Sequence, residues 1–507
     1  MVQFWRPFLI VWALLAALSV CWSFTTPISA SPDEPAHLVR AASVARGEWV
    51  GMPSPAGNVV TVPRYIANSQ RETCFAFHPE LSAGCVTPNP GGPGESVRAT
   101  TTAGLYNPLY YLAVGWPSLL FHDDAGIYVM RVVSGILTTL FAALAFAVLW
   151  TLPRRLLTIL GFAAAMTPAL LFLSGSVNPS GLEATTVLAL FAATLAIVLD
   201  PDSSARPGRL PGRAAIVAVA GAVAVNTRGL SPLWVLAAIA VPLILADRTL
   251  LRGVFSRRAT WITVAVLGLA TAGAFAWTLG SNSLLNAVNH PEATSQHFPG
   301  IGTNPLSGFW ITLTRTVEYA HGVIGLFGWL DTPAPPEVFF VWATLIGALL
   351  LAASSVLRGR RLVFALVLLL AYVLLPPIVQ GAYITGGGII WQGRYAIPLF
   401  LCLVVGVSAV LDTALRLRAG LAWWHRLSAI AVVALAASHL YAFENTLRRY
   451  AVGAEGSLKV MLVGTPPWSP PGGVLPWLVA MTLLLAAAAT ITIRSLRAPP
   501  KTISAHG

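Results

Sequence analysis

The sequence predicts an all-α protein that crosses a lipid bilayer many times. Its 507 residues are 56% hydrophobic and only 10% charged, and its mean hydropathy of +0.73 excludes an ordinary soluble protein. Apolar runs near 20 residues recur along the whole chain, long enough to cross a hydrocarbon core ~30 Å thick. Every backbone polar group inside lipid must be bonded internally, and in Leu-, Ala- and Val-rich runs of this length that favours helices over barrel strands.

Apolar runs mark twelve candidate spans, near residues 8–24, 127–151, 155–174, 180–199, 213–228, 231–247, 259–280, 336–357, 362–380, 393–412, 425–443 and 474–494. The first run has an alternative, because Ile28-Ser29-Ala30 loosely resembles the cleavage site of a signal peptide. Tryptophans at both ends of the run, Trp5 and Trp22, and its length favour an uncleaved helix.

The net charge of +12 comes mainly from arginines in the breaks between apolar runs. Such clusters mark cytoplasmic loops, so the basicity reports topology and argues against nucleic-acid binding. The segment 106–121 (YNPLYYLAVGWPSLLF) is short and holds two prolines, and counting it as a span would place Arg154 and Arg155 outside. Leaving it on the outer face puts both termini in the cytoplasm, and of the arginine clusters only the pair Arg448-Arg449 then lies outside. The other clusters comprise Arg206, Arg209 and Arg213; Arg248, Arg252, Arg257 and Arg258; Arg358, Arg360 and Arg361; Arg416, Arg418 and Arg426; and Arg494, Arg497 and Lys501.

This topology divides the chain into a first helix, a long outer loop, a main bundle and a last helix. The boundaries are 1–25 for the first transmembrane helix, 26–126 for an extracytoplasmic loop with juxtamembrane helices, 127–443 for the main bundle with outer loops at 281–335 and 381–394, 444–473 for another outer loop, and 474–507 for the last helix and a cytoplasmic tail. Two of the four cysteines, Cys74 and Cys85, lie in the first outer loop, where an extracytoplasmic location is compatible with a disulfide. His78 alone does not complete a zinc ligand set with them.

An acidic pair, Asp33-Glu34, follows the first helix at the membrane surface. Adjacent carboxylates repel each other, and partial burial raises the pKa of at least one, which suits a general base. The pair is equally compatible with a divalent cation such as Mg²⁺ or Mn²⁺. The alternative is a helix cap, since Ser31-Pro32-Asp33-Glu34 reads as a helix start. A cap explains one acid but explains His37 and Arg40 poorly. In a helix that starts near Pro32, both residues fall on the same face as Asp33, which favours a functional cluster.

Three further polar residues lie where hydrophobic helices turn on the same face. Asn178 begins the turn NPSGLE, in which Asn-Pro is also an ordinary turn initiator. Glu183 stands just inside an apolar run, where a carboxylate needs a partner. Arg228 lies in a short outer turn, against the charge rule, so we expect it to meet an anion. A salt bridge between Arg228 and Glu183 is the alternative.

Two later outer segments carry candidate ligand contacts. In GWLDTP, Trp329 offers an aromatic face to a sugar and Asp331 an acceptor for its hydroxyls, although a helix cap and an interfacial tryptophan explain them as well. In GGGIIWQGRY, Gln392 and Arg394 stand at the start of an apolar helix. A guanidinium is costly there unless it meets an anion, and its fork suits phosphate oxygens.

Together these residues predict a phospholipid-linked sugar as substrate. The residues expected to contact its phosphate or sugar are His37, Arg40, Asn178, Glu183, Arg228, Trp329, Asp331, Gln392 and Arg394. Its polyprenyl tail would stay in the bilayer, its phosphate would meet arginine, and its sugar would meet aromatic and acidic groups. A carboxylate would deprotonate an acceptor hydroxyl that attacks the anomeric carbon, while cations stabilise the phosphate leaving group.

The motifs PDEPAH, YNPLYY, NPSGLE, GWLDTP and WQGRY, in this order between about residues 30 and 400, resemble a poorly characterised family of bacterial predicted membrane proteins in the GT-C glycosyltransferase superfamily. The resemblance implies a GT-C-like fold and a hexosyl- or pentosyltransferase of the plasma membrane. Such an enzyme would move a sugar from a polyprenyl-phosphate donor to an envelope glycan or protein during polysaccharide biosynthesis. It also implies that Asp33 or Glu34 is the catalytic base or a metal-contacting acid, and that 106–121 forms juxtamembrane helices.

Two rival functions remain open. A flippase or transporter of lipid-linked glycans predicts ionisable residues along a pathway at mid-membrane depth. Here they lie near one face, apart from Arg131 and Glu183, which favours an enzyme. A non-catalytic subunit of an envelope-polysaccharide assembly complex would tolerate replacement of Asp33 and Glu34.

Overall fold

The computed structural model describes residues 2–87, 92–200, 209–281, 299–415, 417 and 421–497. Of the features used above, Arg206, Arg416, Arg418, Lys501 and residues 282–298 of the outer loop 281–335 lie outside this part.

Nine helices in the described part are long and apolar enough to cross a membrane, which confirms an all-α polytopic membrane protein. They are α1 (Val2–Thr25), α5 (Ala125–Trp150), α8 (Pro179–Leu199), α12 (Arg258–Gly280), α16 (Pro336–Val356), α17 (Arg360–Gly387), α18 (Ile397–Leu415), α19 (Ala422–Val452) and α21 (Val474–Arg497).

Two further helices, α6 (Leu156–Ala165) and α7 (Pro168–Ser174), are together long and apolar enough for a tenth span and are bent by 61° at the break between them. The break falls at Thr167-Pro168, since proline lacks the N–H that would continue the helix. The Thr167 hydroxyl accepts from Leu170 N (3.3 Å) and donates to Val323 O (2.8 Å). The two other predicted spans form shorter helices, α9 (Arg209–Val225) and α10 (Ser231–Leu243). The 13 residues of α10 extend about 20 Å, which is less than the ~30 Å thickness of the hydrocarbon core.

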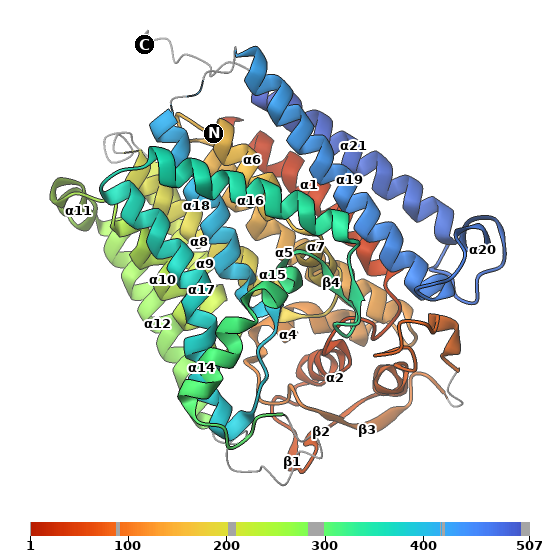
Figure 1. Cartoon of the computed structure of the whole chain (residues 1–507). Helices are drawn as coiled ribbons and strands as arrows, with labels where there is room; N and C mark the ends of the chain where they lie inside the picture. The colour runs from red at the N-terminus through yellow and green to blue at the C-terminus, as the bar shows by residue number, and fades with distance from the viewer. Residues whose placement is uncertain are drawn as a thin grey trace.

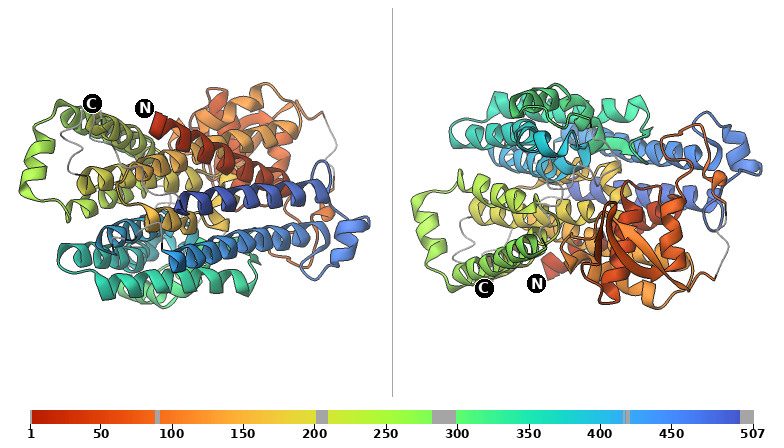
Figure 2. Two further views of the ribbon diagram at one scale, coloured as in Figure 1. Left: turned by 90° about the horizontal axis from the view of Figure 1, so that it is seen from above. Right: turned by 90° about the horizontal axis from the view of Figure 1, so that it is seen from below.

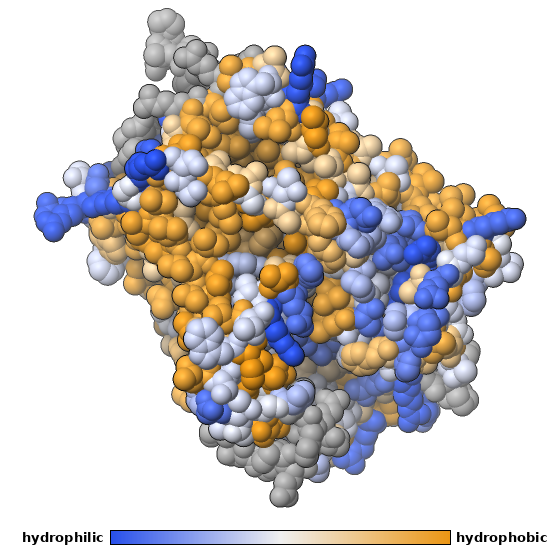
Figure 3. Space-filling model, in the orientation of Figure 1, coloured by the Kyte–Doolittle hydropathy of each residue, from blue (hydrophilic) through white to orange (hydrophobic). Residues whose placement is uncertain are grey.

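Two helices form the centre of the bundle. In α18 and α8, 94% and 83% of the apolar stretch is buried, whereas in α12 the buried share is 11%. Helix α5 packs against α8, α16 and α17 pack against α18, and α12 lies on the outer side of α9 (Figures 1 and 2). Apolar side chains cover most of the helical surface, and hydrophilic ones gather at the lower right, over the first loop (Figure 3). The apolar surface suits contact with lipid.

The first loop folds into a small unit of helices and strands at one end of the bundle (Figure 1). It comprises α2 (Glu34–Ala45), β1 (Met52–Ser54), β2 (Gly57–Pro63), α3 (Arg64–Asn68), η1 (Ser69–Arg71), η2 (Ala83–Cys85), β3 (Ser96–Thr101), α4 (Pro108–Gly115) and η3 (Trp116–Leu119). The segment 106–121 therefore forms short helices and no span, as expected. The antiparallel sheet β1-β2-β3 is a feature that the sequence analysis missed. Its signal was the alternation in β2, where buried Val60 and Val62 flank exposed Thr61.

The same end carries several shorter elements from later in the chain. They are α14 (Pro305–Thr314), α15 (Thr316–Gly325), the two-stranded β4 (Leu326–Phe327) and β5 (Thr332–Pro333), η5 (Gly393–Ala396) and α20 (Leu458–Val463). We call this end of the bundle the loop end. The opposite end, where α1 begins and α21 finishes, carries α11 (Arg248–Phe255) (Figure 1). Arg154, between α5 and α6, and Arg358 and Arg361, at the junction of α16 and α17, belong to the same end. We call it the arginine end.

Candidate functional site

The segment between α1 and α2, residues 26–33, is fixed by side chains from distant parts of the chain. Arg131 of α5 donates to the carbonyls of Thr26 (2.6 Å) and Pro27 (2.8 Å). The Trp329 indole N–H donates to Ser29 O at 2.9 Å. Buried carbonyls need such donors, so the path of this segment is set by the bundle.

Two residues of this segment adopt left-handed backbone conformations that side chains disfavour. Ser29 has φ 65° and Asp33 has φ 62°. Each conformation costs of order 1–3 kcal/mol and persists only where the surroundings fix it. At Asp33 the fixing comes through the preceding carbonyl, Pro32 O, which accepts from Asn178 Nδ2 (3.0 Å) and Arg394 Nη1 (3.2 Å). Asn178 also caps α8 through Ser180 N (3.0 Å).

The two adjacent carboxylates do not form one site. Glu34 is fully buried and forms a two-pronged ion pair with Arg131, at 2.8 Å from Nε to Oε1 and 2.5 Å from Nη2 to Oε2. Its Oε1 also accepts from Val177 N (3.0 Å). The prediction that Glu34 serves as catalytic base or metal ligand with Asp33 is therefore wrong in its geometry, because Arg131 occupies its oxygens.

Asp33, by contrast, keeps 47% of its side chain exposed while forming an ion pair with Arg394, which is 4% exposed. Burial of its surroundings would raise the pKa of Asp33, but Arg394, His37 and Arg228 outweigh this and hold the pKa below its usual value. Asp33 is thus an ionised, accessible carboxylate on a rigid segment, which a base requires. The capping interpretation is half right, since Asp33 precedes α2 but makes no side-chain cap.

Arg228 lies beside this pair. Its guanidinium carbon stands 4.5 Å from the centroid of the Tyr395 ring, and the Arg394 guanidinium carbon stands 5.2 Å from the same ring. Arg228 donates to the Ser180 hydroxyl. Two cations therefore flank one aromatic ring next to Asp33, an excess of positive charge that suits an anionic ligand.

The salt bridge considered between Arg228 and Glu183 does not form within the described part. Glu183 is buried, and its Oε1 accepts from the Ser231 hydroxyl (2.6 Å). This hydrogen bond joins α8 to the start of α10. Glu183 therefore has a structural partner and does not reach a ligand through that oxygen.

His37 and Arg40 share the buried face of α2, but only His37 turns to the site. The Tyr111 hydroxyl and His37 Nδ1 are 2.8 Å apart. The pKa of His37 is lowered to about 3, mainly by burial. The charges of Arg228 and Arg394 also lower it, and the charge of Asp33 raises it in part. Arg40 donates to the carbonyls of Trp49 and Tyr106 (2.7 Å for the latter), and burial lowers its pKa to about 10. The expected contact of Arg40 with a donor phosphate is not supported, because two backbone carbonyls take its guanidinium.

Trp329 and Asp331 belong to a separate cluster. Asp331 forms an ion pair with Arg449 of α19 (3.2 Å) and accepts from Phe77 N (2.8 Å) and Trp329 N (3.1 Å). The Trp329 ring lies 5.8 Å from the Phe77 ring. Asp331 therefore fastens the first loop to the bundle. The proposed contact of Asp331 with sugar hydroxyls is not supported.

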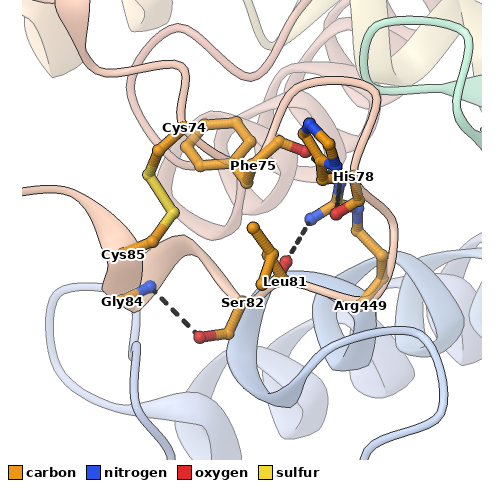
Figure 4. The surroundings of a disulfide bond; sticks show 8 residues. All are labelled: Cys74, Phe75, His78, Leu81, Ser82, Gly84, Cys85 and Arg449. Carbon is orange, nitrogen blue, oxygen red and sulfur yellow. Dashed lines mark hydrogen bonds between the residues drawn. A yellow bond between two sulfur atoms is a disulfide. The ribbon is translucent and has the colours of Figure 1, made fainter.

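The disulfide predicted as compatible with the first loop is present between Cys74 and Cys85. The loop that it closes surrounds Arg449, as Figure 4 shows. Arg449 donates to the carbonyls of Phe75 (2.7 Å), His78 (3.2 Å) and Leu81 (2.9 Å). We call Arg449, Asp331 and loop 75–81 the loop clamp.

Gln392 lies next to the site, but its Oε1 is buried without a hydrogen-bond partner in the described part. The neighbouring amide that the sequence analysis missed, Gln380, holds the turn before it. Gln380 Nε2 donates to Gly388 O (2.7 Å), and its Oε1 accepts from Trp391 N (2.8 Å) and Ile390 N (3.1 Å). This turn sets the position from which Arg394 reaches Asp33.

The described residues bring together Asp33, His37, Asn178, Arg228 and Arg394 and divert Glu34, Arg40, Glu183 and Asp331 to structural contacts. Sequence reasoning missed Arg131 and Arg449 as partners. For Arg131 the signal was a lone cation in an apolar run, which needs a buried partner. No group of three His, Cys, Asp or Glu side chains in the described part could hold a metal ion.

Taken together, the fold and this cluster define a polytopic membrane protein with an ion-paired polar centre at one end of its bundle. The chain belongs to the family described as "Predicted membrane protein (DUF2142)", whose profile matches residues 17–403. No curated protein matches the chain.

A crystal structure of ArnT from Cupriavidus metallidurans in the apo state is similar to this chain with 16% sequence identity, covering 96% of this chain and 76% of that chain, at a TM-score of 0.45. The family match identifies a membrane protein, and its activity has to be argued from the chemistry of the site.

Proposed function

We propose that the chain is a GT-C type membrane glycosyltransferase that moves a sugar from a polyprenyl-phosphate donor to an acceptor hydroxyl of the cell envelope, with Asp33 as catalytic base. One observation carries the proposal: Asp33 is the half-exposed member of an ion pair with buried Arg394, on a strained backbone fixed by the bundle. The neighbouring carboxylate, Glu34, forms a buried ion pair with Arg131. By the charge rule, the loop end faces out of a bacterial plasma membrane.

The two arginines would hold the donor phosphate. Arg394 and Arg228 place two positive charges around one carboxylate and one aromatic ring. A second anion would balance this charge, and guanidinium forks match phosphate oxygens. The Arg394 Nε is buried without a hydrogen bond to any described residue. The polyprenyl tail would lie along the apolar helices.

The reaction balances with these groups alone. The acceptor oxygen forms a bond to the anomeric carbon, and the bond between that carbon and the phosphate oxygen breaks. The acceptor proton passes to Asp33, and polyprenyl phosphate leaves with the bonding electrons, stabilised by the arginines.

Arg394 couples donor binding to the strength of the base. In the ion pair, Arg394 holds the pKa of Asp33 down, which makes the carboxylate a weak base. A donor phosphate that competes for Arg394 would loosen this pair, so the pKa of Asp33 would rise once donor is bound. The base would therefore gain strength only when there is a sugar to transfer.

A divalent cation fits this site poorly. Magnesium takes one or two carboxylates together with substrate phosphates, and Asp33 alone remains for it after Glu34 is paired. The proposed reaction uses neither Mg²⁺ nor Mn²⁺. Chelation with EDTA during turnover checks this, and loss of activity that Mg²⁺ or Mn²⁺ restores would bring a cation back into the mechanism.

The test measures release of polyprenyl phosphate from a panel of polyprenyl-phosphate sugars by purified protein in nanodiscs, with envelope acceptors. Asp33→Asn should lower turnover by about 10²–10⁴-fold. The matched control is Glu455→Gln, since Glu455 is exposed at the loop end and its side chain bonds to no described residue. The control should keep wild-type turnover.

Full turnover by folded Asp33→Asn would refute Asp33 as base. If no donor is consumed, yet vesicles carry lipid-linked sugar across the bilayer, the chain is a transporter and the proposal fails. If the chain neither turns over nor transports, and both variants still support polymer synthesis in cells, it is an assembly subunit.

A further inference from the structure

A cavity of about 860 Å³ lies at the arginine end, away from the Asp33 site. Six helices meet around it, because its lining comes from residues after α5, at the end of α8, after α10, at the end of α16, at the start of α17 and at the end of α18. A volume of several hundred Å³ is typical of ligand sites. Neither the family match nor the proposed reaction uses it.

The lining combines an apolar floor with a basic rim. Leu152, Leu199 and Leu245 are among the apolar residues, and the charged residues among those that line it are Arg154, Arg358, Arg360 and Arg361. No carboxylate is among the described lining residues.

The acidic residues near the cavity have partners of their own. Asp412 is buried and accepts from the N–H and hydroxyl of Thr158, at 3.2 Å each. Asp200 pairs with Arg209 (2.9 Å) and Arg213 (3.0 Å). These carboxylates form no ion pair with the four rim arginines, although Asp412 lies near enough to Arg154 to interact with its charge.

Backbone carbonyls position three of the four guanidiniums. Arg154 donates from Nη1 to Thr413 O (3.0 Å), and Arg360 from Nη1 to Ala246 O (2.9 Å). Arg358 also uses Nη1, to Leu357 O (2.7 Å). Arg361 makes no hydrogen bond or ion pair with the described residues. Each guanidinium has five donors, so donors remain for an anion.

We propose that this cavity binds a phosphate-bearing anion at the arginine end. Four guanidiniums over an apolar floor match the headgroup phosphate of an anionic lipid, with the first carbons of its chains against the leucines. A soluble phosphate would use the same rim. Arginines that only set the topology of the chain in the membrane would not need to line one cavity. They would also not need backbone carbonyls that fix the positions of their guanidiniums.

The experiment titrates delipidated protein in detergent with phosphatidylglycerol and, separately, with inorganic pyrophosphate, and follows bound ligand by native mass spectrometry. Arg358→Gln/Arg361→Gln removes two rim charges. Arg252→Gln/Arg258→Gln is the control, since both arginines are exposed on α11 and α12 and do not line the cavity. The rim variant should lose at least about tenfold in affinity, and the control less than about twofold.

The two ligands separate the possible sources. Saturable phosphatidylglycerol binding that only the rim variant weakens, with no displacement by pyrophosphate, assigns a lipid headgroup. Pyrophosphate binding with the same variant pattern assigns a soluble phosphate. Equal losses in both variants, or binding that neither variant changes, would overturn the proposal. Arg361→Gln alone replaces the double variant if that does not fold, since Arg361 holds no described residue in place.

Discussion

The loop end contains two aspartate–arginine pairs that look alike in sequence and differ in the structure. Asp33 pairs with Arg394, and its side chain is 47% exposed. Asp331 pairs with Arg449, and its side chain is 8% exposed. Asp331 also accepts from three further donors, the backbone N–H groups of Phe77 and Trp329 and the Thr332 hydroxyl. Asp33 has Arg394 as its hydrogen-bond donor in the described part.

The difference teaches how to separate a carboxylate that fastens from one that can react. A fully satisfied, buried ion pair leaves no lone pair for a substrate and is costly to disturb. Glu34 with Arg131 is the extreme case, with both side chains 0% exposed. An accessible carboxylate with few partners is free to exchange them. Substitutions at the fastening pairs should therefore change stability, and those at Asp33 should change turnover.

The largest effect on stability should follow Glu34→Gln. The substitution leaves Arg131 buried with an unbalanced charge, which costs about 3–5 kcal/mol, and we expect little folded protein after purification. Thermal unfolding in detergent measures this. The control is Glu183→Gln, a buried glutamate of the same bundle without an ion pair in the described part, which should unfold close to wild type. Equal stability of the two variants would contradict the distinction.

Removal of the disulfide should have the next largest effect. Cys74 and Cys85 close a short loop whose carbonyls hold Arg449, and cross-links of this length contribute about 3 kcal/mol. We expect Cys74→Ser/Cys85→Ser to unfold at a lower temperature and to expose loop 75–81 to protease. The control is Cys402→Ser, at a buried free cysteine of α18, which should leave the protease pattern of the loop unchanged.

The sequence was sufficient for the class of fold because hydrophobicity is a local property. Runs of apolar residues predicted the helices, and the arginines between these runs predicted which loops share an end of the bundle. The β1-β2-β3 sheet was missed because its strands are short and stand out little in an apolar chain. The bend between α6 and α7 depends on Thr167 finding a carbonyl in α15, 156 residues away, which no window of sequence contains.

The site could be predicted only as a set of residues, not as roles. Asp33, Asn178, Arg228 and Arg394 could be selected as candidates because polar residues at one membrane face are few and costly. Whether Asp33 or Glu34 is the free carboxylate depends on Arg131, 97 residues further on. In the same way the sequence suggested that Asp331 contacts a sugar, whereas in the structure Asp331 forms an ion pair with Arg449, 118 residues away. Partners at such distances follow from packing and cannot be read from motifs.

A smaller effect is expected when the clamp carboxylate is neutralised. Asp331→Asn keeps the oxygen that accepts from Trp329 N but loses the ion pair with Arg449. Asp331 meets Arg449 through one contact of 3.2 Å, whereas Glu34 meets Arg131 with both carboxylate oxygens, so the cost should be smaller, about 2 kcal/mol. Folded Asp331→Asn should keep wild-type turnover of the donor, in contrast to Asp33→Asn. Loss of turnover without loss of stability would move Asp331 into the site.

The smallest effect is a pH dependence of stability that passes through His37. Burial lowers the pKa of His37 to about 3, below its ordinary value near 6.5. The stability that neutral His37 contributes is present above pH 6.5 and is lost as the pH falls from there toward 3. Between pH 7 and 5.5 the loss is about 1 kcal/mol. Asp33, with its lowered pKa, loses its contribution only below its usual range, so it does not interfere.

Glu72 acts in the opposite direction within the same range. Burial and Asp124 raise its pKa to about 7, so its contribution favours the folded state as the pH falls. The difference between wild type and His37→Asn removes this background. Between pH 7 and 5.5, unfolding temperatures of the wild type should fall more steeply than those of His37→Asn, whereas exposed His122→Asn should follow the wild type. Parallel profiles for all three proteins would mean that His37 can take up a proton in the folded state, beside Arg228 and Arg394, and that this face of the site is wetter than the contact with Tyr111 implies.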